Sequence, residues 1–248
     1  MTATTESRLS LPGTVILIPA YNEGAAIAEV VAEVRQYCDC PLVVIDDAST
    51  DDTAERAREA GARVIPLVSQ LGAWGAMQTG LRYATRNGFS LAVTMDADGQ
   101  HEATSLGALA APVTRGDADV AIGACTRRGS RMRKIAWLLM KRVSGLTLED
   151  ITSGFRVYNK RAIGELVRRR ATLLDYQDVG VLLLLQSRGL RVVDVEVNMR
   201  DRIHGASRVF SSWLVVSFYM CNTLLLGLTK RRLARAWRPS PTTAHRGA

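Results

Sequence analysis

Residues 14–37 read TVILIPAYNEGAAIAEVVAEVRQY and decide the expected fold. The first seven residues form a β-branched apolar run with the length of one buried strand. From Gly24 onward the apolar side chains recur at helical spacing, so a helix should follow the strand directly (Ile27, Val30, Val31 and Val34). The polar residues YNE stand at the junction, where the strand ends and the helix begins.

The same plan recurs along the chain. Residues 41–62, PLVVIDDASTDDTAERAREAGA, give a second strand and helix, with Ser49 or Thr50 expected to cap the helix and Gly61 to end it. Further strands are expected in ARVIPLV, SLAVTM and ADVAIGA. Regular alternation of strands and helices is typical of an α/β fold with a mainly parallel, Rossmann-like sheet flanked by helices.

Polar loops follow four of these strands. In open parallel sheets, ligands bind at the carboxyl ends of the strands, where such loops meet. A polar ligand site is therefore expected along that edge, built from PAYNE (19–23), DDASTDD (46–52), SQLGAWG (69–75) and DADGQH (96–101).

The loop DADGQH is consistent either with an ordinary Asp–Gly turn or with a divalent cation site. An Asp-nucleophile phosphatase would have Thr or Val where Gln100 stands, and an EF-hand would have Glu where Gly107 stands. A dinucleotide-binding loop would have three glycines after the first strand, which offers one. What remains is Mg²⁺ or Mn²⁺ shared with a substrate diphosphate, with Asp98 and Gln100 as ligands and Asp96 on the metal or a ribose.

The composition indicates a globular protein with an anionic partner. The 248 residues are 47% hydrophobic and 23% charged, with a net charge of +8. That charge suits a phosphorylated substrate or an anionic lipid surface, whereas no nucleic-acid-binding module is recognised. The four cysteines make no disulfide framework or zinc pattern and are expected to be reduced thiols. No secretory signal is recognised at the start, so we expect the body of the protein in the cytosol.

The C-terminal part differs in character. The basic run 127–142 suits either a solvated helix face or a contact with anionic lipid heads. The segment after Arg208 carries no charge until Lys230, long enough to span a bilayer, but its polar residues and flanking charges favour a helix in the cytosolic membrane interface. We therefore expect a tail (1–13), a main domain (14–210), an apolar membrane-associating helix (211–232) and a basic tail (233–248).

Five motifs occur in the order seen in family 2 glycosyltransferases. The chain resembles that family, and within it the enzymes similar to dolichyl-phosphate mannosyltransferase and bacterial polyprenyl-phosphate glycosyltransferases. The resemblance implies a GT-A fold, a nucleotide-sugar donor, a divalent metal and inversion at the anomeric carbon. The motifs are IPAYNE (18–23), VIDDASTDDT (44–53), DADGQH (96–101), DITSGFRVY (150–158) and RIHGASR (202–208).

The resemblance also implies roles for individual residues. Those expected to bind the nucleotide are Pro19, Tyr21, Glu23, Asp46 and Asp47. Those expected on the acceptor and phosphate side are Asp150, Arg156, Arg202, Ser207 and Arg208. Departures from the family pattern leave the identity of sugar and acceptor open; they are Gln70, Trp74, Ala124, Cys125 and Asp178.

The expected activity is a metal-dependent, inverting transfer from a UDP- or GDP-sugar to a polyprenyl phosphate at the cytosolic membrane face. A phosphate oxygen is already anionic, so that acceptor needs no general base; a hydroxyl acceptor would make Asp150 the base. The alternatives are transfer to a saccharide or other hydroxyl, and non-catalytic binding of a nucleotide sugar. A homo-oligomer or a membrane-protein partner is compatible with each.

Overall fold

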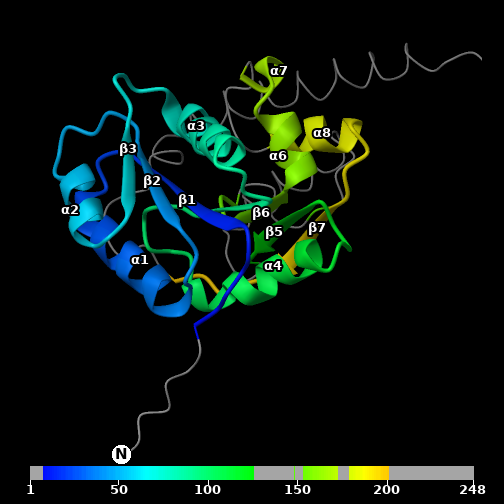
Figure 1. Cartoon of the computed structure of the whole chain (residues 1–248), viewed down its shortest axis with the longest axis horizontal. Helices are drawn as coiled ribbons and strands as arrows, with labels where there is room; N and C mark the ends of the chain where they lie inside the picture. Colours follow the sequence, from blue (N-terminus) through cyan, green and yellow to red (C-terminus); the bar gives the residue numbers. More distant parts are fainter. Residues whose placement is uncertain (1–7, 126–147, 149–152, 173–178, 201–248) are drawn as a thin grey trace, which may run out of the picture. The chain divides into compact units, whose positions relative to one another are not determined.

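The computed structural model describes residues 8–125, 148, 153–172 and 179–200 (Figure 1). These residues all belong to one compact unit, made of residues 1–128 and 148–206. A second unit, residues 129–147 and 207–248, lies outside the described residues, as do the basic run and the predicted apolar helix.

A single seven-stranded sheet runs through the described part of the chain, in the order β3-β2-β1-β4-β6-β5-β7. Strands β1 to β4 pair in parallel, and so do β5 and β7, which confirms the predicted α/β fold with a mainly parallel sheet. Strand β6 lies antiparallel to both β4 and β5. The strands are β1 Thr14–Ala20, β2 Leu42–Asp46, β3 Arg63–Pro66, β4 Leu91–Thr94, β5 Val120–Ala124, β6 Arg156–Asn159 and β7 Val192–Glu196.

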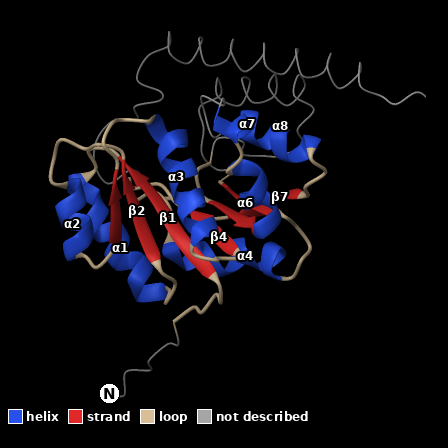
Figure 2. Ribbon diagram, turned by 45° about the horizontal axis from the view of Figure 1, so that its top comes forward, coloured by secondary structure: helices blue, strands red, loops and turns tan. Residues whose placement is uncertain are grey.

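Helices cover both faces of this sheet. Figures 1 and 2 show α3, α6 and α8 on one side and α1 and α4 on the other. Alternate side chains of β1 point to opposite faces of the sheet. Ile16 and Ile18 pack in the core with α1 and α4, whereas Leu17 faces α3. The helices are α1 Gly24–Tyr37, α2 Thr53–Glu59, α3 Gly72–Arg86, η1 Ala103–Ser105, α4 Leu106–Thr114, α6 Lys160–Leu166, α7 Arg169–Thr172 and α8 Val179–Ser187.

The start of α2 differs from the prediction. The helix begins at Thr53, and Ser49 lies four residues before it, so neither Ser49 nor Thr50 caps it. The Ser49 hydroxyl instead accepts a hydrogen bond from the backbone N of Asn22, at 2.9 Å. Gly61 follows the last turn with φ of +95°, as predicted for a helix end.

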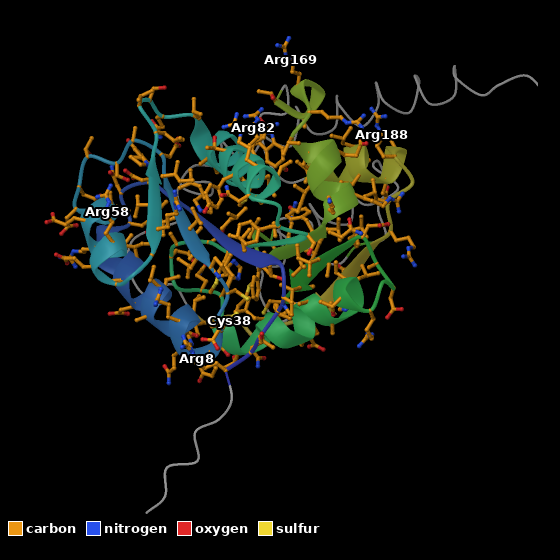
Figure 3. The ribbon with its side chains drawn as sticks, viewed as in Figure 1. Arg8, Cys38, Arg58, Arg82, Arg169 and Arg188 are labelled. Carbon is orange, nitrogen blue, oxygen red and sulfur yellow. The ribbon has the colours of Figure 1, made fainter. Side chains whose placement is uncertain are left out.

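The amino-terminal edge of the sheet carries two neighbouring thiols. Cys38 is buried where α1 ends, and the guanidinium of Arg8 donates to its carbonyl at 3.4 Å (Figure 3). A hydrogen bond with the Cys40 side chain lowers the pKa of Cys38 to about 7. Cys38 precedes β2, so this pair lies at the edge opposite the carboxyl ends of the parallel strands.

Helix α3 packs on the sheet through Gly80. A Cβ there would lie 2.9 Å from Cδ1 of Ile45 and 3.1 Å from Cδ1 of Leu17, both fully buried. We expect Gly80→Ala to lower the free energy of unfolding, because overpacking costs about 1–3 kcal/mol and the gain in helix propensity returns only about 1 kcal/mol. Gly164→Ala in α6 is the control: its Cβ would meet nothing within 4 Å, so it should stabilise the protein. Urea unfolding checks both, and equal shifts would contradict the prediction.

Candidate functional site

The loops that follow β1 and β2 are locked together at the carboxyl edge. The backbone N of Asn22 donates to the Ser49 hydroxyl, and the backbone N of Thr50 donates to Oδ1 of Asn22 at 2.8 Å. The backbone N of Glu23 donates to Oγ1 of Thr53 at 2.9 Å. Asn22 itself adopts φ of +51°, a conformation that non-glycine residues rarely take. The motifs IPAYNE and DDASTDD therefore form one preformed surface, as their places at adjacent strand ends predicted.

Asp51 secures the same pair of loops. Its carboxylate accepts a hydrogen bond from the backbone N of Gly24 at 3.1 Å. It also accepts two from Thr53, one from the backbone N at 3.1 Å and one from the hydroxyl. Burial alone would raise the pKa of Asp51, but these hydrogen bonds outweigh it and hold the pKa below its usual value. Gly24 has no room for a side chain, because a Cβ would lie 2.1 Å from Oδ1 of Asp52.

The residues expected to bind the nucleotide line this surface. Pro19, Tyr21 and Glu23 are half-buried at the end of β1 and the start of α1. Asp46 is buried, and its Oδ1 accepts from the backbone N of Ser49 at 3.2 Å. The structure thus brings these four together at the adjacent ends of β1 and β2, and their contact with a nucleotide stays a prediction.

Asp47 has a structural role that the sequence did not suggest. Its side chain is buried, and its two carboxylate oxygens accept from the backbone N of Leu71 at 2.7 Å and of Gly72 at 2.9 Å. Asp47 thereby fixes the turn that begins α3, and so joins the SQLGAWG loop to the same edge. Its predicted contact with a base or ribose stays a prediction.

The acidic loop after β4 presents one exposed and one buried carboxylate. The Asp96 side chain is 38% exposed, and its Oδ2 lies 2.9 Å from Nε2 of His101. Asp98 is buried, and its Oδ1 accepts from the backbone N of Gln100 at 3.1 Å. Gly99, which lies between Asp98 and Gln100, takes φ of +75°, a conformation that favours glycine.

Antiparallel pairing brings the SGFR part of the fourth motif against this loop. Thr94 pairs with Arg156, and the Thr94 hydroxyl donates to the carbonyl of Gly154 at 2.7 Å. A Cβ on Gly154 would lie 2.2 Å from Oδ1 of Asp96, so only glycine allows the carboxylate its place. Arg156 is fully buried, and its Nε donates to the carbonyl of Ser153 at 2.7 Å. Its contact with substrate stays a prediction.

A further contact, not expected from the sequence, ties the acidic loop to the segment after β7. The backbone N of Arg200 donates to the carbonyl of Gln100 at 2.9 Å, and its guanidinium donates to Glu33 at 2.8 and 3.2 Å. Glu33 also accepts from the backbone N of Ala103 at 3.0 Å. The hydrogen bond and charge of Glu33, with a smaller effect of Glu102, raise the pKa of Arg200. Arg200, which stands two residues before the RIHGASR motif in the sequence, therefore lies beside the acidic loop.

Four predicted site residues lie outside the described residues. They are Asp150, Arg202, Ser207 and Arg208. Two of their described neighbours in sequence lie at the acidic loop: Arg200 donates to the carbonyl of Gln100, and Gly154 lies beside the Asp96 carboxylate.

The acidic loop offers donors that fit a hard divalent cation. Asp96, Asp98 and Gln100 bring two carboxylates and one amide, which are the oxygen donors that Mg²⁺ and Mn²⁺ prefer. Among the residues that the structure describes, no group of three or more His, Cys, Asp or Glu side chains is arranged to hold a metal. The set suits a cation that is shared with a ligand's phosphates rather than one enclosed by protein alone.

Comparison with known proteins identifies the class. The family model described as glycosyl transferase family 2 matches residues 15–167, more than half of the chain, and the chain belongs to this family. It is 28% identical over 217 residues to the polyprenol monophosphomannose synthase of Mycolicibacterium smegmatis, covering 80% of this chain and 82% of that protein. It is also 28% identical over 238 residues to the undecaprenyl-phosphate mannosyltransferase of Micrococcus luteus, covering 87% and 94%.

A solved structure shares the GT-A fold. Glucosyl-3-phosphoglycerate synthase from Mycobacterium tuberculosis, in complex with Mn²⁺, uridine diphosphate and phosphoglyceric acid, superposes with a TM-score of 0.68. The two chains are 21% identical, and the match covers 92% of this chain and 79% of the other. The likeness confirms the predicted fold, and the family match confirms that the protein is a glycosyltransferase.

Proposed function

We propose that this protein transfers a sugar, with inversion, from a nucleoside diphosphate sugar to a polyprenyl phosphate at the cytosolic face of the membrane. The observation that carries the proposal is the position of the acidic loop, whose residues Asp96 and Asp98 share the carboxyl edge with the loops after β1 and β2. The two mannosyltransferase-type relatives, whose names contain polyprenol and undecaprenyl phosphate, support the lipid acceptor.

In this proposal the donor occupies the carboxyl edge of the sheet. Pro19, Tyr21, Glu23 and Asp46 hold the nucleoside, and Asp47 supports them by fixing the start of α3. Asp96, Asp98 and Gln100 would hold Mg²⁺ or Mn²⁺. Once bound, such a cation would stabilise the negative charge that grows on the leaving diphosphate. The protein's own part is to hold the two nucleoside loops together and to shape the acidic loop, which their backbone hydrogen bonds accomplish.

The acceptor side is assigned to the fourth and fifth motifs, DITSGFRVY (150–158) and RIHGASR (202–208). A polyprenyl phosphate attacks through an oxygen that is already anionic, so the protein needs to orient this group but not deprotonate it. Asp150 would orient the sugar or the acceptor, and Arg202, Ser207 and Arg208 would bind phosphate groups, for which guanidinium groups are suited. Arg156 would bind substrate only if the buried SGFR segment opens, since it is fully buried here.

Membrane association belongs to the proposal as well. Within the described ranges, no helix is long and apolar enough to cross a bilayer. We propose that the apolar segment 211–232 and the basic run 127–142 contact an anionic membrane surface, because both combine apolar side chains with flanking Lys and Arg. Release of the protein from membranes by alkaline carbonate supports an interfacial helix, whereas resistance to extraction contradicts it.

A direct assay tests the proposed reaction. The purified full chain is incubated with Mn²⁺, labelled UDP- and GDP-sugars and undecaprenyl phosphate in detergent, with undecaprenol and a free saccharide as parallel acceptors. We expect label in a lipid product only with the phosphate acceptor, and its release by mild acid, because a glycosyl phosphate bond is acid-labile. Transfer to the saccharide alone, or an acid-stable product, would contradict the proposed acceptor.

A further inference from the structure

The carboxylate of Asp96 lies beside His101 and Gly154. Oδ2 lies 2.9 Å from Nε2 of His101, and Oδ1 lies where a Cβ on Gly154 would come within 2.2 Å. Yet the Asp96 side chain is 38% exposed, so neither contact closes it off from a ligand. An exposed aspartate on a loop ordinarily exchanges between rotamers. If the protein already holds it in one rotamer, binding a ligand costs less conformational entropy.

His101 is itself held firmly enough to orient another group. Its side chain is 3% exposed, and its ring stacks on Phe155 with centroids 5.0 Å apart and 30° between the planes. Its backbone forms an antiparallel bridge with Met199. Nδ1 is buried and has no hydrogen-bond partner among the described residues, so the proton of a neutral ring belongs on Nε2, where Asp96 accepts it.

We propose that His101 and Gly154 are positioning residues, which hold Asp96 in the orientation that meets the cation bound with the nucleotide donor. This inference rests on the proposed function. His101 orients the carboxylate through the Nε2 hydrogen bond, and Gly154 leaves the space into which Oδ1 turns.

A merely structural role for His101 predicts something different. A buried ring packed on Phe155 would stabilise the fold, and its loss would change the melting temperature but not ligand affinity in the molecules that remain folded. Positioning predicts a loss of affinity that does not follow stability, and a rescue by any side chain that restores the donor at Nε2.

The test measures binding of Mn²⁺ to the full chain in the presence of UDP, and of GDP in a parallel titration, by calorimetry and by the EPR signal of free Mn²⁺. His101→Leu keeps apolar bulk and removes the donor, whereas His101→Gln places an amide N–H near the position of Nε2. We expect the leucine variant to bind Mn²⁺ roughly 10–100-fold more weakly, the range typical when the hydrogen-bond partner of a metal ligand is removed. The glutamine variant should recover most of that loss.

Gly154→Ala perturbs Asp96 through Oδ1 instead of Oδ2, and it tests the inference if His101→Leu fails to fold. We expect the same weakening, because the added Cβ displaces Oδ1. Gly164→Ala, where a Cβ meets nothing, is the matched control and should bind as the wild type does. Unchanged Mn²⁺ affinity in a folded His101→Leu or Gly154→Ala protein, or equal losses in the leucine and glutamine variants, overturns the inference. If the wild-type protein binds no Mn²⁺ in the presence of UDP and none in the presence of GDP, the proposed function is overturned, and this inference with it.

Discussion

Replacing Asp98 with asparagine is expected to reduce sugar transfer about 10³-fold in kcat/KM, a change equivalent to several kcal/mol of lost charge stabilisation. Asp98 is 6% exposed, and its Oδ1 accepts a hydrogen bond from the backbone N of Gln100, which the Oδ1 of asparagine can also accept. Asparagine keeps the size and one oxygen of the side chain. What it removes is the negative charge that would hold Mg²⁺ or Mn²⁺ at the diphosphate.

Initial rates with the preferred labelled nucleotide sugar, over a range of Mn²⁺ concentrations, measure this effect. The matched control is Asp117→Asn: that carboxylate is 62% exposed, pairs with Arg115 at 2.9 Å and lies in the turn before β5, so its loss should leave the rate unchanged. A chelator should abolish wild-type transfer, and added Mn²⁺ should restore it. Full activity of the Asp98→Asn protein, with unaltered Mn²⁺ dependence, would contradict the assignment of the acidic loop.

The part of the fold that could be predicted is the part governed by local pattern. The buried runs TVILIPA and LVVID are β-branched and end in polar loops, and helical periodicity follows each of them. Parallel pairing then places their carboxyl ends side by side, so the meeting of the loops at 19–23, 46–52 and 96–101 follows from topology alone. The candidate donor side of the site was accordingly visible in the sequence.

The rest depends on contacts between residues distant in sequence. Nothing in RVYN shows that β6 runs antiparallel between β4 and β5, since a strand buried on both faces has the same pattern in either direction. Arg200 and Glu33 are 167 residues apart, and neither stands in a recognised motif. Asp47 matched a motif, but its carboxylate is taken up by the backbone of a third loop. Such pairings appear only once the chain is folded.

The contacts of Asp119, directly before β5 and away from the site, could not be predicted from the sequence either. Its side chain is 3% exposed and accepts from Nδ2 of Asn159 at 2.8 Å, from the backbone N of Arg191 at 2.8 Å and from Nη1 of Arg161 at 3.1 Å. One carboxylate thus joins β5, β6 and the start of β7. We expect Asp119→Ala to lower the free energy of unfolding at pH 7 by about 2–4 kcal/mol, because the Asn159 amide, the backbone N of Arg191 and the guanidinium of Arg161 lose a buried acceptor that they share.

This loss should depend on pH in a definite direction. Burial would raise the pKa of Asp119, but the hydrogen bonds from Arg191 and Asn159, and then the charges of the two arginines, outweigh it and hold the pKa below its usual value. A carboxylate with a folded pKa below its unfolded value stabilises the protein above the unfolded pKa, and this contribution disappears as the pH falls through the folded value. The difference between wild type and Asp119→Ala should therefore be full at pH 7 and shrink below about pH 4.

Urea unfolding of both proteins between pH 7 and pH 3 measures that difference. Asp117→Ala is the control two residues away, because an exposed carboxylate paired with Arg115 should change stability by less than about 1 kcal/mol at any pH. We expect the ionised carboxylate of Asp119, and not the packing of its side chain, to produce this effect. A loss that remains the same size at pH 3 as at pH 7 would show that packing, and not the buried charge, joins these three strands.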